Sequence, residues 1–260
     1  MSLQEEILKE LYSNQQEKYT VYTKKVVTTT SLEIIGVRMA VLHDMAERYK
    51  DRFLEIAQLP YTTYEELMFK GLVIAKADAP ISQKKKVIRR FLELVDNWAI
   101  VDSFAAAFLY KESERSYFIA FAKDLAFSDL QYVSRAGIVL LSTNLHDSVA
   151  IDRAYRLFDR LVYGQPAKDT AVAWAIATYS HYDESRSLEF FINSDIPISI
   201  KLKAAQKIRE SRRLSDDYKD KITYLANYEK VWRKKQLIEE RKQKAKEERL
   251  KKKGKGKKKK

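Results

Sequence analysis

The chain has 260 residues, of which 45% are hydrophobic and 33% charged, a composition typical of a soluble globular protein rather than a disordered or membrane-embedded one. With 6 Gly and 4 Pro, it holds too few turn residues to favour a β-sandwich or a doubly wound α/β fold. The remaining prediction is an all-helical protein. The 0 Cys exclude disulfides, thiolate metal sites and cysteine nucleophiles.

The net charge of +13 comes from one end of the sequence. Residues 230–260 hold 17 of the 49 basic and 4 of the 36 acidic residues, which leaves 32 of each in residues 1–229. We therefore predict a neutral helical domain over residues 1–229 and a basic tail over residues 230–260, helical at first and disordered at its lysine-rich end. The tail is expected either to bind nucleic acid without sequence preference or simply to keep the chain in solution.

Helical periodicity begins at residues 5–13, where apolar side chains recur every three to four positions. Residues 19–30 (Tyr19 to Thr30) are rich in β-branched side chains, whose stiffness disfavours helices, so this segment is predicted to be extended or irregular. The remaining predicted helices cover residues 37–49, 51–57, 62–75, 82–94, 98–110, 115–126, 130–141, 148–162, 168–179, 185–193, 199–212 and 216–249.

Short loops join these helices, and all four prolines fall between them. The pattern predicts an α-solenoid (α-α superhelix) of antiparallel helix pairs. No strict period supports the repeat, so an irregular helical bundle stays open as the alternative. The sequence has no run of about 18 apolar residues and its N-terminal stretch is acidic, so neither a membrane span nor a signal peptide is expected, and the expected location is cytoplasmic.

One predicted helix combines an aromatic and an acidic side chain on one face. Trp98 and Asp102 lie four residues apart within an otherwise apolar run. A carboxylate there must find a partner or line a cleft, because an unpaired buried charge is very costly. Arg135 and Trp174 interrupt two other apolar helices and are candidates to complete such a cleft. Considered singly, each residue is better explained by core packing or by an ion pair than by a functional role.

These residues belong to short motifs that resemble the DNA alkylation repair family of HEAT-like-repeat DNA glycosylases. The motifs cover most of residues 5–225: Ile35-Gly36-Val37-Arg38, Asn97-Trp98-Ala99-Ile100-Val101-Asp102-Ser103, Tyr132-Val133-Ser134-Arg135, Ala173-Trp174 and Gln206-Lys207-Ile208-Arg209-Glu210-Ser211. The resemblance implies hydrolysis of the N-glycosidic bond of cationic N3- or N7-alkylated purines in duplex DNA, without metal or cofactor and without flipping the base into a deep pocket. It assigns catalysis to Asp102, Trp98 and Trp174.

The resemblance also implies DNA contacts for Arg38, Arg135, Lys207 and Arg209, with Arg135 holding a phosphate. In this family a short second helix helps to hold DNA, and the segment predicted to be non-helical takes its place here. The basic residues that are candidates to line a DNA groove, or equally to cover a solvated outer face, are Lys84, Lys85, Lys86, Arg89, Arg90, Lys201, Lys203, Lys207, Arg209, Arg212 and Arg213.

Three function classes follow from these observations. The first is an alkylpurine glycosylase acting as a monomer on double-stranded DNA. The second is a non-catalytic binder of damaged or structured nucleic acid, favoured if residues 19–30 are extended. The third is a protein-interaction scaffold, which predicts an apolar concave face and Arg135 in an ion pair away from solvent. The three His residues are far apart in sequence, so no metal site is expected.

Overall fold

The computed structural model describes the backbone of residues 2–256 and the side chains of residues 2–244. The helices are α1 (Leu3–Ser13), α2 (Glu17–Val26), α3 (Met39–Tyr49), η1 (Lys50–Arg52), α4 (Phe53–Gln58), α5 (Tyr64–Lys76), α6 (Ile81–Leu94), α7 (Trp98–Ala107), η2 (Glu112–Glu114), α8 (Arg115–Ala126), α9 (Gln131–Asn144), α10 (Ser148–Phe158), α11 (Pro166–Ser180), α12 (Glu184–Asn193), α13 (Ile198–Glu210) and α14 (Asp216–Gly256). Between residues 2 and 256 the β-structure consists of one isolated bridge, from Glu33 to Thr63.

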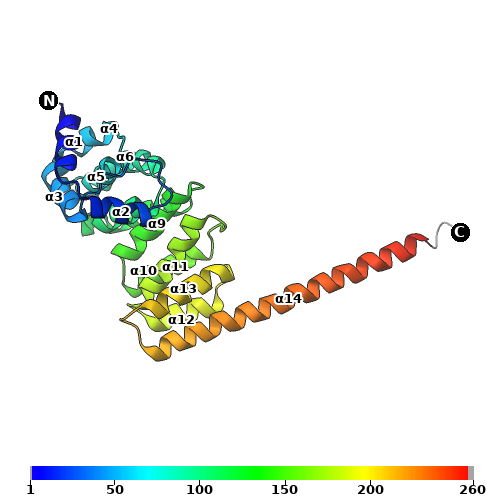
Figure 1. Ribbon diagram of the computed structural model, residues 1–260. Coiled ribbons are helices and arrows are strands. Elements are labelled where there is room, and N and C mark those ends of the chain that lie inside the picture. Colours follow the sequence, from blue (N-terminus) through cyan, green and yellow to red (C-terminus); the bar gives the residue numbers. More distant parts are fainter. Residues whose placement is uncertain (1, 257–260) are drawn as a thin grey trace.

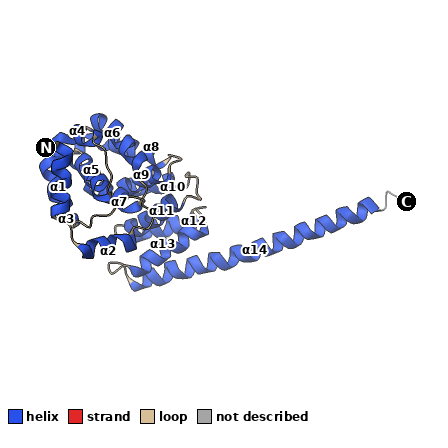
Figure 2. Cartoon of the chain, turned by 45° about the horizontal axis from the view of Figure 1, so that its top comes forward, coloured by secondary structure: helices blue, strands red, loops and turns tan. Residues whose placement is uncertain are grey.

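The helices form two rows that together curve into an arc (Figure 1). In one row, α3, α5, α7, α9, α11 and α13 pack each against the next, and α14 closes the row against α13. The second row contains α4, α6, α8, α10 and α12, which follow one another along one side of the molecule, with α2 and α13 on the opposite side (Figure 2). We call the first row the inner row and the second the outer row. The predicted all-helical solenoid is confirmed.

Local sequence signals fix where the helices begin. Ser2 and Thr63 form capping boxes with Glu5 and Glu66, which satisfy free amides at the starts of α1 and α5. The Asp147 side chain caps α10 by accepting from the Ala150 amide, and Asp183 caps α12 in the same way.

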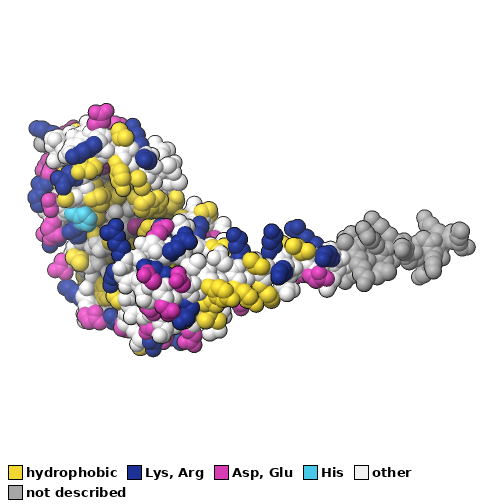
Figure 3. All heavy atoms as spheres, turned by 60° about the horizontal axis from the view of Figure 1, so that its bottom comes forward, with side chains coloured by type: hydrophobic (Ala, Val, Ile, Leu, Met, Phe, Trp, Pro, Cys, Tyr) yellow, Lys and Arg dark blue, Asp and Glu magenta, His cyan; other side chains and the backbone are white. Residues whose placement is uncertain are grey.

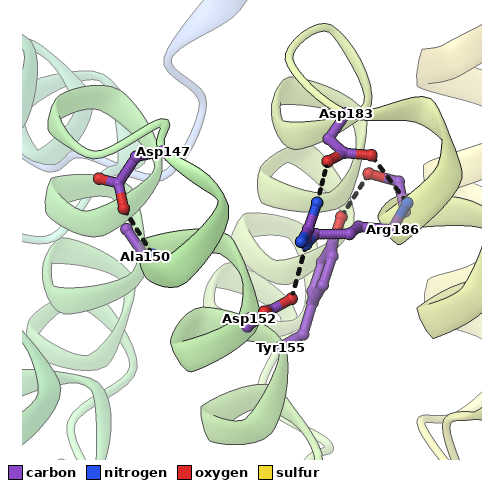
Figure 4. Close-up of polar contacts among 7 residues, drawn as sticks. Asp147, Ala150, Asp152, Tyr155, Asp183 and Arg186 are labelled. Atoms are coloured by element: carbon purple, nitrogen blue, oxygen red, sulfur yellow. Dashed lines mark hydrogen bonds and ion pairs between the residues drawn. The ribbon is translucent and has the colours of Figure 1, made fainter.

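Close packing joins the two rows, and polar contacts join helices within the outer row. A Cβ at Gly137 of α9 would lie 2.3 Å from the Ala122 carbonyl oxygen of α8, so only glycine lets these helices approach so closely. Within the outer row, Arg186 of α12 donates to Asp183 on its own helix start and to Asp152 of α10 (Figure 4).

The segment from Tyr19 to Thr30 corrects the sequence prediction, because it contains the helix α2. Glu17 in its first turn and Lys24 and Lys25 in its last turn are favourably placed in the field of a helix. The Thr20 hydroxyl donates to the Ile35 carbonyl oxygen at 2.6 Å, which fastens α2 to the following loop. Tertiary contact thus outweighs the weak helix propensity of β-branched residues, and residues 27–30 alone stay non-helical.

The last helix, α14, begins in the core and continues far beyond it (Figure 1). Tyr218, Ile222 and Ala226 are buried, whereas every described side chain after Glu229 is exposed. Hydrophobic side chains gather where α14 leaves the body, and Lys and Arg follow further out (Figure 3). The division at residue 229 stays a prediction, since the helix crosses it without a break. The last helix was predicted to end near residue 249, with disorder in the lysine-rich end that follows, but α14 continues to Gly256. Residues 257–260 lie outside the described residues, so the predicted disorder stays a prediction there.

Candidate functional site

The N-terminus of α7 presents the two central candidates. The Asn97 side chain is completely buried and its Oδ1 accepts from the Ile100 amide at 3.1 Å, which fixes the first turn of the helix. Trp98 and Asp102 then lie one turn apart on the same face, and both stay partly exposed. Ile100, Val101 and Phe104 on the other faces are fully buried, so the helix cannot rotate these two side chains out of place.

Asp102 is held by an arginine from the next helix of the inner row. Arg135 of α9 donates through Nε to Asp102 Oδ1 at 2.8 Å and through Nη2 to Oδ2 at 2.6 Å, and its Nη1 donates to the Ala167 carbonyl oxygen at 3.0 Å. The Arg135 side chain is 4% exposed and that of Asp102 is 24% exposed. This two-point ion pair orients the carboxylate while leaving one side of it open to solvent.

A cleft of about 470 Å³, which we call the inner cleft, lies beside this pair. Its lining comes from α2, from the segment between α2 and α3, from the first half of α3, from α5 and from α7. The lining residues are Tyr19, Tyr22, Thr23, Val26, Val27, Val37, Arg38, Met39, Ala40, Leu42, Tyr64, Met68, Trp98, Ala99, Asp102 and Ser103. Its walls are mainly apolar, with Arg38 and Asp102 as the charged groups. Burial raises the pKa of Tyr64 well above its usual range, so its hydroxyl stays protonated at neutral pH.

A buried glutamate shapes the loop that presents Arg38. The Glu65 carboxylate of α5 accepts from the amides of Ile35, Gly36 and Val37 at 2.9, 2.8 and 3.4 Å. Gly36 has φ +95°, and a Cβ there would lie 2.1 Å from the Thr20 hydroxyl. The loop is therefore fixed on both sides, by α5 and by α2.

The remaining candidates lie further along the inner row. Trp174 of α11 is 44% exposed, and the Lys207 ammonium of α13 lies 4.9 Å from the centre of its ring. Lys207 also pairs with Glu210 at 2.7 Å, and Arg209 is exposed. The structure thus brings Trp98, Asp102 and Arg38 together in one cleft and adds Arg135 beneath them. It places Trp174 and Lys207 as a second cluster two helices away.

Two of the proposed groove lysines prove to be structural. Lys84 is completely buried and donates to the Ala77 and Leu109 carbonyl oxygens at 3.1 and 2.8 Å, and Lys201 is 1% exposed and pairs with Glu229 at 3.0 Å. Neither side chain lines a groove or a solvated face, so both expectations were wrong for them. Burial lowers the pKa of Lys84 to about 8, because the charged form loses its hydration.

Two features of this site escaped the sequence reasoning. Glu65 carries no motif that distinguishes it from a solvated helix residue, although it lies within the first turn after the Thr63 cap. The tyrosines of α2 were missed because the segment was predicted to be extended; Glu17 before it and the Lys24-Lys25 pair were the available helix signals. Among the described side chains, those of residues 2–244, no cluster of three or more potential metal-ligating groups is present. Within the described part of the chain, no helix is long and apolar enough to cross a bilayer.

A comparison with family models matches residues 5–215 to the DNA alkylation repair enzyme model. No curated protein and no solved structure matches the chain. The matched range contains the inner row from α3 to α13, and with it both clusters of candidate residues. The chain therefore belongs to the DNA alkylation repair enzyme family.

Proposed function

We propose that the protein is an alkylpurine DNA glycosylase that hydrolyses the N-glycosidic bond of cationic N3- or N7-alkylated purines in duplex DNA. The observation that carries this proposal is the state of Asp102. Its carboxylate is oriented by two hydrogen bonds from Arg135, yet it is 24% exposed at the edge of a cleft that also holds Trp98. A carboxylate that served packing alone would not need an open side.

Hydrolysis of this glycosidic bond needs no catalytic group of the protein besides this carboxylate. When the C1′–N bond breaks, its electron pair neutralises the cationic purine, so the leaving base needs no general acid. The sugar becomes positively charged, and a nearby carboxylate stabilises it. Water then bonds to C1′ and passes a proton to Asp102, which therefore serves both as electrostatic partner and as base.

The aromatic and basic side chains supply binding. The π face of Trp98, which lines the inner cleft, favours the positive charge of the lesion and packs against its sugar. Trp174 lies two helices away with Lys207 over its ring, so we assign it to the DNA beside the lesion. Arg38 and Arg209 are exposed cations for backbone phosphates, and Lys207, which is half-buried and paired with Glu210, is a further one. Arg135 was expected to hold a phosphate, but three of its N–H groups already serve Asp102 and Ala167. We assign it to positioning Asp102.

The position of α2 supports the enzyme over a non-catalytic binder. A helix in this segment was the feature that separates the two hypotheses, and its tyrosines line the same cleft as Trp98. Because the walls of the inner cleft are mainly apolar and carry few charged groups, the cleft suits a lesion that stays stacked in the duplex. Bulky adducts are then tolerated.

One observation favours the scaffold alternative. Arg135 lies in an ion pair away from solvent, as that hypothesis predicts. The same face, however, exposes Trp174 and the cations Arg38 and Arg209, which a purely apolar docking surface would lack. We therefore place DNA rather than protein on the inner row.

The experiment is release of 7-methylguanine from methylated duplex DNA by the full chain. We expect Asp102→Asn to lower the rate about a hundredfold or more, since it removes the charge but keeps the shape. Asp44→Asn, at an exposed position of α3, is the matched control and should keep the wild-type rate. Equal release by wild type and Asp102→Asn would remove the assigned mechanism.

The basic tail, residues 230–260, is proposed to add sequence-independent attraction to nucleic acid for a monomeric, cytoplasmic protein. Such attraction weakens steeply with salt. A salt titration of duplex binding by the full chain and by a chain ending at residue 229 tests this role. Binding that persists without the tail belongs to the inner row, whereas binding that vanishes belongs to the tail.

A further inference from the structure

A second cleft, of about 510 Å³, lies between α8 and α10 of the outer row. These two helices lie on the opposite side of the molecule from α2 (Figure 2). We call it the outer cleft. Its lining residues are Ile119, Lys123, Phe127, Leu141, Leu145, Ala150, Arg153, Ala154, Arg156, Leu157, Asp159 and Arg160. The floor is apolar and is formed by the outward side of α9 together with α10.

The outer row is open at this point. Helices α4 and α6, α6 and α8, and α10 and α12 pack against each other, whereas the outer cleft lies between α8 and α10. Figure 2 shows these helices following one another along one side. The inner row continues beneath the gap, because α9 packs against both α7 and α11. The gap thus exposes apolar surface that a neighbouring helix covers elsewhere in the row.

The rim of the outer cleft carries an excess of free cations. Arg153 and Arg156 are exposed one turn apart on α10, Arg160 follows just after the helix, and Lys123 faces them from α8. Among the side chains of residues 2–244, none of these four cations forms an ion pair with a carboxylate. Asp159 is the acidic residue of the lining. Arg160 instead lies 6.0 Å from the centre of the Phe127 ring, which is 43% exposed.

We infer that the outer cleft binds an acidic amphipathic segment of a partner protein. The apolar floor is complementary to apolar side chains, and the arginines are complementary to carboxylates that flank those side chains. From Arg153 to Arg160 the row spans about 10 Å at the rise of a helix, which is longer than one anionic head group can serve. Phosphates of nucleic acid would satisfy the cations but leave the apolar floor uncovered.

The test uses a fluorescein-labelled helical peptide with leucines on one face and glutamates beside them, and a scrambled peptide of the same composition. The full chain should bind the amphipathic peptide more tightly than the scrambled one, because only the amphipathic peptide matches the apolar floor and the cationic rim. The lysine-rich tail attracts both peptides equally, so it does not contribute to the difference. The double variant Arg153→Glu/Arg156→Glu should weaken amphipathic binding about tenfold. Phe127→Ser, at an exposed position, should weaken it several-fold by removing apolar contact.

The matched control is Lys85→Glu/Arg90→Glu, the same charge change at exposed positions of α6 outside the cleft. It should bind the peptide as the wild type does. Circular dichroism checks that each variant folds. Equal binding of both peptides, equal losses in the control, or displacement of the peptide by duplex DNA from the outer cleft would each overturn the inference.

Discussion

The two clefts of this molecule carry opposite arrangements of charge on the two sides of one helical stack. In the inner cleft, Asp102 is paired with Arg135, and the pair lies between the neighbouring helices α7 and α9. In the outer cleft, Arg153, Arg156 and Lys123 stand at the rim without carboxylate partners among the described residues. A paired charge is fixed in direction, which suits chemistry on a bound sugar. An unpaired charge at a rim is free to meet a partner, which suits recognition.

The comparison also explains why net charge is a poor guide to this protein. Residues 1–229 have no net charge. The inner cleft nevertheless pairs Asp102 with Arg135, whereas the cations of the outer cleft have no such partner among the described residues. Function follows from where the helices place each charge and from how deeply it is buried. Variants at four places in the molecule test this contrast.

The largest expected effect concerns the loop that shapes the inner cleft. Glu65→Ala leaves three backbone amides without acceptors, those of Ile35, Gly36 and Val37. We expect it to lower the free energy of unfolding by about 4 kcal/mol, since each buried unsatisfied amide is costly. Urea denaturation measures the change. A loss below about 1 kcal/mol would mean that the loop does not depend on this carboxylate.

Arg135→Ala separates positioning from general stability. Breaking a largely buried ion pair should cost about 3 kcal/mol, and base release should fall even where the variant is fully folded. Arg135→Lys keeps the charge but not the two-point contact, so it should recover stability more than rate. Full base release by folded Arg135→Ala would show that Asp102 needs no positioning partner.

Lys84 extends the comparison to a cation buried inside the stack. Its pKa is lowered to about 8 from 10.5, so the unfolded chain binds more protons between these values and stability rises with pH across that window. Relative to Lys84→Met, the wild type should gain about 2 kcal/mol between pH 7 and pH 10. Thermal unfolding of both proteins at several pH values measures this slope, and parallel pH profiles would contradict it.

The smallest effect is expected at the outer cleft. Arg153→Glu/Arg156→Glu removes no ion pair and no buried contact, so its free energy of unfolding should stay within about 0.5 kcal/mol of the wild type. Its rate of base release should also be unchanged. A large loss of stability would show that these arginines belong to the fold rather than to a binding surface.

Much of the fold could be predicted because apolar periodicity and prolines mark the helices and their ends. The helix α2 was missed because its β-branched residues outweighed the weak charge signals at its ends, and because the contact of Thr20 with the loop at Ile35 joins residues distant in sequence. The spacing of Trp98 and Asp102 predicted that both lie on one helix face, and both line one cleft, while their role stays a proposal. The fate of each cation could not be predicted: Lys84 and Lys85 are adjacent in sequence, yet one is buried and the other exposed.

The most direct test of the central claim is hydroxyl-radical footprinting of the full chain, with and without a duplex that carries a cationic abasic-sugar mimic. The account predicts protection of Tyr22, Met39 and Trp98, which line the inner cleft, and an unchanged Phe127 in the outer cleft. Protection of Phe127 together with unchanged Tyr22, Met39 and Trp98 would place DNA on the wrong side of the molecule and contradict the account.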